Sequence, residues 1–214
     1  MASRKIRASV TAFILAASIV PAVAADAVPK VVVDAVGYVG RPFADQDRDA
    51  LRKPSEMVAF AKIQPGQKVA DFMPGNGYYT RILAHLVGPQ GRVYAFVPHG
   101  GANPQYVRDQ IAASIKKGIA PPPRAVDAVI AIENVREYSN VMVIWEALTQ
   151  YKGQFAVPDQ LDAVWTSDNY HDLHTEALET PDVGAVDRAI FRALKNDGSY
   201  IVIDHAAAKG AGFK

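Results

Sequence analysis

The sequence predicts an α/β fold with a doubly wound, mostly parallel sheet. Short apolar stretches alternate with stretches whose apolar residues recur at helical spacing, which is the pattern of strands joined by helices. The strands are almost continuously apolar, as expected when helices cover both faces of a parallel sheet. A strand, a helix and a second strand follow one another within residues 66–97, and that order implies parallel neighbours with a right-handed crossover.

The first half of the chain contains two of the expected strands. A charged segment at 26–54 leads into a helix with an apolar face at 57–61. The stretch GQKVADFM at 66–73 is expected to form a short buried strand, followed by a helix from about Tyr78 to Leu86. The second strand is GRVYAFV, which follows a break at Gly88 and Pro89.

The second half continues the alternation. Helices are expected at about 104–117 and 125–138, and NVMVIWEA at 140–147 is the third strand. The fourth strand is LDAVWTSD at 161–168. A helix at about 183–194 ends at Asn-Asp-Gly and leads into the fifth strand, SYIVIDH at 199–205.

The first 25 residues differ from the rest of the chain. Arg4, Lys5 and Arg7 precede an apolar run that ends in Ala-Val-Ala-Ala, which is the pattern of a secretory signal peptide cleaved after Ala24 or Ala25. The run of about 14 residues is shorter than the roughly 20 needed to span a bilayer, so a membrane anchor is the weaker alternative. We therefore expect a signal peptide at 1–25, no stable membrane span after its removal, and a single domain at 26–214.

Composition narrows the class of protein. The chain has 214 residues, 50% of them hydrophobic, which suits one core. Its 23 Lys and Arg against 22 Asp and Glu leave no basic excess, so nucleic acid is not an expected partner. Removal of the three basic residues in the leader would take the formal net charge from +1 to −2. The chain has no cysteine, which excludes a disulfide, a thiolate nucleophile and a Cys-ligated metal.

Two polar features are expected at the surface. Arg41 with Asp45, Asp47 and Asp49 has the composition of a solvated face, and His85 falls on the helix after the first strand.

The stretch VADFMPGNGYYT at 69–80 is the strongest indication of a ligand site. Ligands of open α/β sheets bind at the carboxyl ends of strands where the strand order reverses. Gly75 and Gly77 permit positive φ and a close backbone approach, Asp71 can accept hydrogen bonds, and Tyr78 is a candidate contact. A plain strand-to-helix turn is the alternative. A dinucleotide fingerprint lacks its third glycine, which is Thr80 here, and a P-loop lacks its Gly-Lys-Ser/Thr.

Two stretches resemble the class I S-adenosylmethionine-dependent methyltransferases. The pattern D-x-x-x-G-x-G-Y after a strand is similar to their motif I, and the following GRVYAFV is similar to their second strand. LDAVWTSDNYHDLH and VDRAIFRALKNDGSYIVIDH are similar to their fourth strand and to the helix and strand after it. With the signal peptide, the chain resembles a group of exported predicted methyltransferases. The resemblance implies a Rossmann-like methyltransferase fold and S-adenosylmethionine as cofactor, with Asp71, Gly75 and Gly77 at its methionine and ribose end and Glu146 near its adenine.

The chain departs from the pattern of that family in three places. Met73 stands where the first glycine of motif I is usual, and Val97 stands where the second strand ends in a ribose-binding acid. The sequence also ends soon after the fifth strand, so the last two strands of the family's sheet are expected to be lacking. An exposed sheet edge would then be available to a second copy, which makes a homodimer an expected partner.

The loop after the fourth strand, SDNYHDLH, carries the catalytic candidates Asn169, Tyr170, His171 and Asp172. Methyl transfer mainly requires alignment of the acceptor, with a base when the acceptor is a hydroxyl or amine. His171 is the candidate base because its ordinary pKa is near neutral, with Asp172 or Asp168 to orient it. Tyr170 would close over the cofactor sulfonium by a cation–π contact. The alternative is that these side chains cap and hydrogen-bond the loop.

Metal binding is a second interpretation of His171-x-x-His174. No third strong ligand has a matching motif, so the sequence predicts no metal site. His205, after Asp204 at the end of the fifth strand, could point into the same crevice, although a loop histidine with satisfied hydrogen bonds is the simpler interpretation.

The sequence thus predicts an exported, periplasmic S-adenosylmethionine-dependent methyltransferase with an unidentified acceptor. The alternative is a non-enzymatic small-molecule-binding protein on a degenerate methyltransferase fold, because Met73 and Val97 replace cofactor-binding residues.

Overall fold

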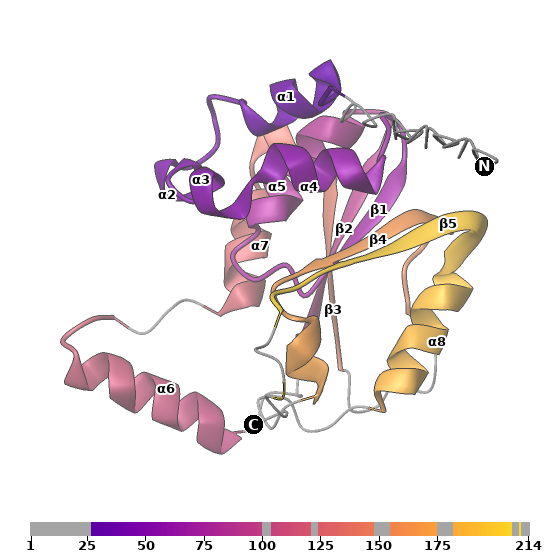
Figure 1. Ribbon diagram of the computed structural model, residues 1–214. Coiled ribbons are helices and arrows are strands. Elements are labelled where there is room, and N and C mark those ends of the chain that lie inside the picture. Colours follow the sequence, from indigo (N-terminus) through magenta and orange to yellow (C-terminus); the bar gives the residue numbers. More distant parts are fainter. Residues whose placement is uncertain are drawn as a thin grey trace, which may run out of the picture.

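A parallel sheet of five strands forms the centre of the structure, a computed structural model that describes residues 27–99, 104–120, 124–147, 155–174, 182–206 and 210. Every neighbouring pair of strands runs parallel (Figure 1). The order is β3-β2-β1-β4-β5, so it reverses between β1 and β4. The strands are β1 (Lys68–Phe72), β2 (Arg92–His99), β3 (Val141–Ala147), β4 (Leu161–Ser167) and β5 (Leu194–Ile203).

Alternate residues of the strands face two different layers of helices. On β2, Val93 and Ala95 belong to one apolar cluster and Tyr94 and Phe96 to the other. The doubly wound sheet that the sequence predicts is therefore confirmed. The first layer contains α1 (Lys30–Val36), α4 (Pro54–Ala61), α5 (Tyr78–Val87) and α7 (Ala125–Glu133), and the second contains α8 (Val183–Ala193) and the 3-10 helix η2 (Tyr170–His174).

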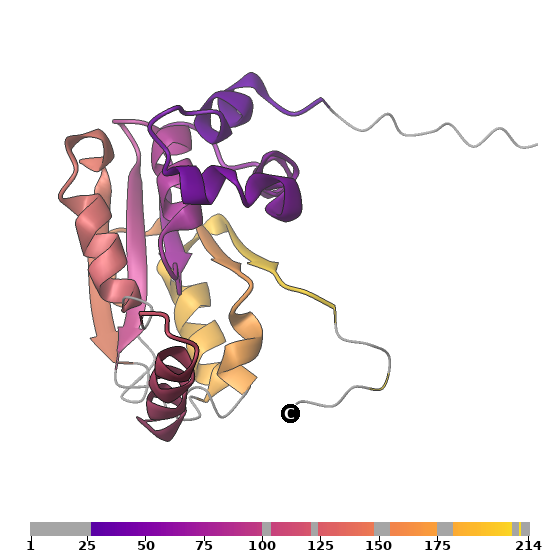
Figure 2. The same cartoon turned by 90° about the vertical axis from the view of Figure 1, so that its left-hand side faces the viewer.

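The short helices of the N-terminal segment complete one end of the molecule. They are α2 (Phe43–Gln46) and α3 (Asp49–Arg52), which precede α4. In both views these indigo helices gather at the end opposite α6 (Pro104–Lys116) (Figure 1, Figure 2). The helix expected at 125–138 is interrupted after α7 and resumes only as the 3-10 helix η1 (Arg136–Tyr138).

The start of β5 differs from the expected helix-to-strand turn. Leu194 pairs with Leu161 directly after α8, and the register then shifts before Ser199 pairs with Ala163. The polar Asn-Asp-Gly stretch therefore lies in an irregularity within β5 rather than before it. Regular pairing from Ser199 onward agrees with the expected strand.

The expected solvated face holds for Asp47, which is exposed, whereas Arg41 and Asp45 are buried in an ion-pair network. Arg41 is 2% exposed, and its Nη2 lies 2.7 Å from Oδ1 of Asp49. Asp45 is 6% exposed and pairs with Arg81 on α5 at 2.8 Å. The prediction was wrong for Arg41 and Asp45 because the partners of these charges come from α5 and from neighbouring N-terminal turns, and paired charges can be buried.

His85 is likewise not a surface residue. Its ring centroid lies 3.7 Å from that of Tyr38 and 5.3 Å from that of Tyr138, and burial lowers its pKa. The N-terminal segment therefore covers this part of α5.

The expected signal peptide at 1–25 lies outside the described residues. Among the helices that the structure describes, none has the length and apolar character needed to cross a membrane.

Candidate functional site

A cleft of about 280 Å³ opens at the carboxyl ends of β1 and β4. These are the two strands between which the order reverses, so the cleft lies where ligands bind in open α/β sheets. Its walls come from three segments: the turn after β1, the end of β4, and the neighbourhood of α3. The first two were expected from the sequence, and the third was not.

The glycine turn after β1 is built from left-handed backbone. Gly75 has φ +55° and Gly77 has φ +75°, and Met73 adopts φ 61° although it is not glycine. Gly75 lines the cleft, and a Cβ there would meet no atom within 4 Å. At Gly77 a Cβ would lie 2.2 Å from Cδ1 of Ile132 on α7. Gly75 thus leaves space beside the cleft, whereas Gly77 permits close packing of α5 on α7.

Asp71, in β1, is the buried acid of the cleft. Its side chain lines the cleft while the residue is only 2% exposed, and Thr80 donates a hydrogen bond from Oγ1 to Oδ2 at 2.6 Å. Burial raises the pKa of Asp71 to about 7, and the bond from Thr80 only partly opposes this. A carboxyl group whose pKa is strongly raised by burial in a cleft is typical of a functional site.

Tyr78 forms the wall between the turn and the N-terminal segment. Its hydroxyl donates to Oδ1 of Asp49 at 2.5 Å, and burial raises its pKa. The guanidiniums of Arg48 and Arg52 lie 5.5 Å and 4.9 Å from its ring centroid. The sequence-predicted contact residue Tyr78 is thus in the cleft wall, with cations stacked on its ring.

Arg48 and Arg52 bring positive charge to the cleft. Arg52 pairs with Asp168 at 3.0 Å, and Asp168 sits in a left-handed conformation at φ 58°. Arg48 lines the same cleft and forms no ion pair with any residue that the structure describes. Its guanidinium is therefore available to an anionic group of a ligand.

Asn169 joins the two loops that border the cleft. Its Nδ2 donates to the backbone carbonyl of Met73, and its Oδ1 accepts from the hydroxyl of Thr166. The amide consequently holds the exit of β4 against the turn after β1. This is a positioning role for a residue that the sequence singled out as catalytic.

Tyr170 does not lie with the other candidates. Its hydroxyl donates to Oδ2 of Asp187 on α8 at 3.0 Å, and burial raises its pKa to about 12. It lines a separate, mostly apolar hollow with Phe191 and Tyr200. The expected contact with a sulfonium is therefore not formed by this arrangement, because the first turn of η2 directs the ring to the α8 side of the sheet.

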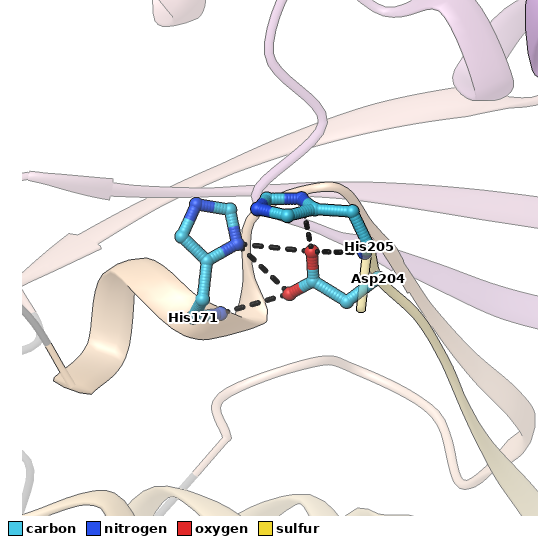
Figure 3. A group of neighbouring side chains, drawn as sticks. All are labelled: His171, Asp204 and His205. Carbon is cyan, nitrogen blue, oxygen red and sulfur yellow. Dashed lines mark hydrogen bonds and ion pairs between the residues drawn. The ribbon is translucent and has the colours of Figure 1, made fainter. Parts of the chain in front are cut away.

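His171 is held by an acid, but not by the one expected. Its Nδ1 lies 2.9 Å from Oδ2 of Asp204, at the end of β5, and its backbone N–H donates to the same oxygen (Figure 3). Asp172 lies 3.4 Å from Nε2, and Asp168 is paired with Arg52 instead. Burial raises the pKa of Asp172, whereas the bonds from His171 lower the pKa of Asp204 against the effect of its own burial.

The adenine side of the expected site is less completely described. Glu146 belongs to β3, but its side chain and that of His99 lie outside the described part of the structure. Val97 is buried at 5% exposure near the end of β2. The role that the family resemblance gives to Glu146 therefore stays a prediction.

Sequence reasoning missed Arg48, Arg52 and the pairing of Asp204 with His171. Arg48 and Arg52 are four residues apart, the spacing of one helical face, and this was the available signal. Nothing local in the sequence joins Asp204 to His171, because β4 and β5 bring them together across 33 positions.

Comparison with known proteins supports the fold and a partial sequence similarity. No protein-family model matches the chain. The chain is 32% identical over 87 residues to a protein-L-isoaspartate O-methyltransferase of Aeropyrum pernix, covering 39% of this chain and 33% of that protein. It is 39% identical over 51 residues to the enzyme of the same name from Ignicoccus hospitalis, covering 24% of each. The matched segments thus span only a third and a quarter of these curated relatives.

A solved structure matches more of the chain. The SAM-dependent methyltransferase of Aquifex aeolicus superposes with a TM-score of 0.52 at 19% identity, covering 78% of this chain and 73% of that one. The chain therefore has the Rossmann-like fold of the class I S-adenosylmethionine-dependent methyltransferases, and part of its sequence is similar to members of that superfamily.

Proposed function

We propose that the protein is an S-adenosylmethionine-dependent methyltransferase. The observation that carries this proposal is the cleft at the switch point between β1 and β4, where a glycine turn, the buried acid Asp71 and the guanidinium of Arg48 meet. The local similarity to protein-L-isoaspartate O-methyltransferases supports it.

The residues of the cleft suit the methionine end of this cofactor. That end carries a carboxylate and an ammonium group, and Arg48 offers a cation without an ion-pair partner among the described residues. Asp71 and Asp168 also line the cleft and offer carboxylate oxygens. Gly75 leaves the backbone of the turn open to a ligand. When bound, the cofactor would supply a methyl group activated by the adjacent sulfonium.

His171 is the candidate base of the proposed reaction. A proton on Nδ1 would be held by Asp204, which leaves Nε2 to accept a proton from an acceptor hydroxyl or amine. His171 follows two residues after Asn169, which lines the cleft, so the base stands on the loop that borders it. Tyr170 has no part in this proposal because its hydroxyl is bonded to Asp187.

Carboxylate acceptors can be distinguished from hydroxyl or amine acceptors by whether methyl transfer needs a base. The two curated relatives are named for methylation of isoaspartate, whose carboxylate is already deprotonated at neutral pH. A carboxylate acceptor should therefore react as fast without His171 as with it, whereas a hydroxyl or amine acceptor should not.

Calorimetric titration with S-adenosylmethionine and with its demethylated product tests the proposal. Arg48→Ala should weaken binding at least about tenfold, since a charge-assisted hydrogen bond contributes about 1.5–3 kcal/mol. Arg188→Ala is the matched control, because Arg188 is an exposed guanidinium on α8 that pairs with Asp182 and lines a different hollow. No binding by the parent, or equal losses in both variants, would contradict the assignment of the cleft.

A non-enzymatic binding protein is the second candidate function. The buried Val97 near the end of β2 favours it, because that side chain offers no oxygen to a ribose. Binding of the cofactor without methyl transfer to any acceptor, including an isoaspartyl peptide, would support this candidate over the enzyme. Export remains part of the proposal and is tested separately at the N-terminus.

A further inference from the structure

The carboxyl ends of β4 and β5 bring two imidazoles and a carboxylate together (Figure 3). Oδ2 of Asp204 lies 2.9 Å from Nδ1 of His171, and Oδ1 of Asp204 lies 3.1 Å from Nδ1 of His205. One ligand-type atom from each of the three side chains falls within 4.8 Å of the others. The two imidazole rings are neighbours in an edge-to-face arrangement, with centroids 4.6 Å apart and an interplanar angle of 68°.

These spacings are close to those of a metal coordination sphere. Zn–N and Zn–O bonds of about 2.0–2.2 Å place tetrahedral ligand atoms about 3.3 Å apart. Oδ1 of Asp204 lies 3.0 Å from Nδ1 of His171 and 3.1 Å from Nδ1 of His205, so both nitrogen–oxygen distances are near that value. The two side-chain nitrogens lie within 4.8 Å of each other and would approach further on binding the metal. Imidazole nitrogen with carboxylate oxygen is a ligand set that Zn²⁺ accepts. We propose that His171, Asp204 and His205 form a three-ligand site for a divalent transition metal such as Zn²⁺.

The carboxylate is already oriented for this role by the backbone. The N–H of His171 donates to Oδ2 of Asp204 at 3.0 Å, and the N–H of His205 donates to Oδ1 at 2.9 Å. Bonds of this kind fix the direction of metal-ligating carboxylates in known sites. The side chain of His205 is 67% exposed, which gives an ion a path from solvent and leaves room for water as a further ligand.

Metal binding and base catalysis would exclude each other at His171, an inference that rests on the proposed function. A metal on Nδ1 takes the lone pair of that nitrogen, so the imidazole carries its proton on Nε2, beside Asp172 at 3.4 Å. Without metal, a proton on Nδ1 would be held by Asp204, and Nε2 would then be the nitrogen that accepts another. The bound metal would therefore inhibit transfer to acceptors that need a base.

Direct metal titration of the tag-free full chain tests the site without cofactor or acceptor. We expect saturable binding of one Zn²⁺ per chain by calorimetry, and a visible absorption spectrum of bound Co²⁺ with nitrogen and oxygen ligands. His205→Gln should weaken Zn²⁺ binding at least about tenfold. His174→Gln, which changes an exposed histidine of η2, the element that also carries His171, should leave the affinity within about twofold.

Three results would overturn the proposal. The first is no saturable binding of either metal by the parent. The second is a His205→Gln protein that binds as the parent does. The third is a loss in His174→Gln as large as the loss in His205→Gln, which would move the metal to the His-x-x-His pair. Circular dichroism of both variants confirms that they are folded, and because no methyl transfer is measured, failure of the proposed enzyme activity leaves the result intact.

Discussion

Replacement of Asp71 by asparagine should stabilise the protein while destroying its ligand site. Asp71 is buried at the end of β1, and its pKa is raised to about 7 from an ordinary value of 3.8. The folded protein therefore keeps the proton over a pH range in which the unfolded chain has released it. Unfolding releases a proton in that range, so rising pH favours the unfolded state.

The size of the effect follows from the two pKa values. Each pH unit between them contributes about 1.4 kcal/mol, so the penalty starts near pH 4, grows to about 4 kcal/mol and is complete above pH 7. Between pH 5 and pH 8 the penalty grows by roughly 2–3 kcal/mol. Asparagine is neutral at every pH, and its Oδ1 can still accept the hydrogen bond from Thr80.

Urea unfolding of the parent and of Asp71→Asn at pH 5 and pH 8 measures this penalty. The difference in unfolding free energy, variant minus parent, should increase by roughly 2–3 kcal/mol from pH 5 to pH 8. Asp159→Asn is the control, because the bonds from Lys68 and Tyr94 lower the pKa of Asp159 from 3.8. That carboxylate is ionised in both the folded and the unfolded chain from pH 5 to pH 8, so the difference for this variant should stay constant. Cofactor binding by Asp71→Asn should fall at least about tenfold at pH 7.

A difference between variant and parent that stays constant within about 0.5 kcal/mol would refute the reasoning. It would mean that the carboxylate of Asp71 ionises in the folded protein without cost. A variant that is more stable and still binds the cofactor normally would instead show that the carboxylate of Asp71 does not contribute to cofactor binding.

Four further outcomes are expected. Gly75→Ala should cost about 1–2 kcal/mol for its left-handed backbone alone, and Gly77→Ala should cost more because its Cβ also meets α7; equal losses by thermal unfolding would contradict this. His171→Gln should slow transfer to a hydroxyl or amine acceptor at least about 100-fold while cofactor affinity stays unchanged. A rate within tenfold of the parent's would show that His171 is not the base. N-terminal sequencing of the cell-envelope fraction should give a chain starting at Ala25 or Asp26, and an intact Met1 would contradict export. Light scattering should detect a dimer, because the edge of β5 carries unpaired backbone groups among the described residues; a stable monomer would count against it.

Much of the fold could be read from the sequence because its causes are local. The apolar runs of the strands and the helical spacing between them predicted all five strands, and only the start of β5 differs. The turn after β1 was also foreseeable, since Gly75 and Gly77 adopt backbone angles that few other residues tolerate. The doubly wound fold, which the structural neighbour shares, followed from the same patterns.

The sequence by itself determined the order of the elements and the place of the cleft, at the turn between β1 and α5. Only the tertiary structure decided which charges surround it. Buried Arg41 pairs with half-buried Asp49, Arg48 reaches the cleft from the N-cap of α3, and Asp204 rather than Asp172 holds Nδ1 of His171. The physical reason is that periodicity and turn chemistry act within a few residues, whereas an ion pair depends on the distance between side chains that parallel strands and the N-terminal helices bring together from remote positions.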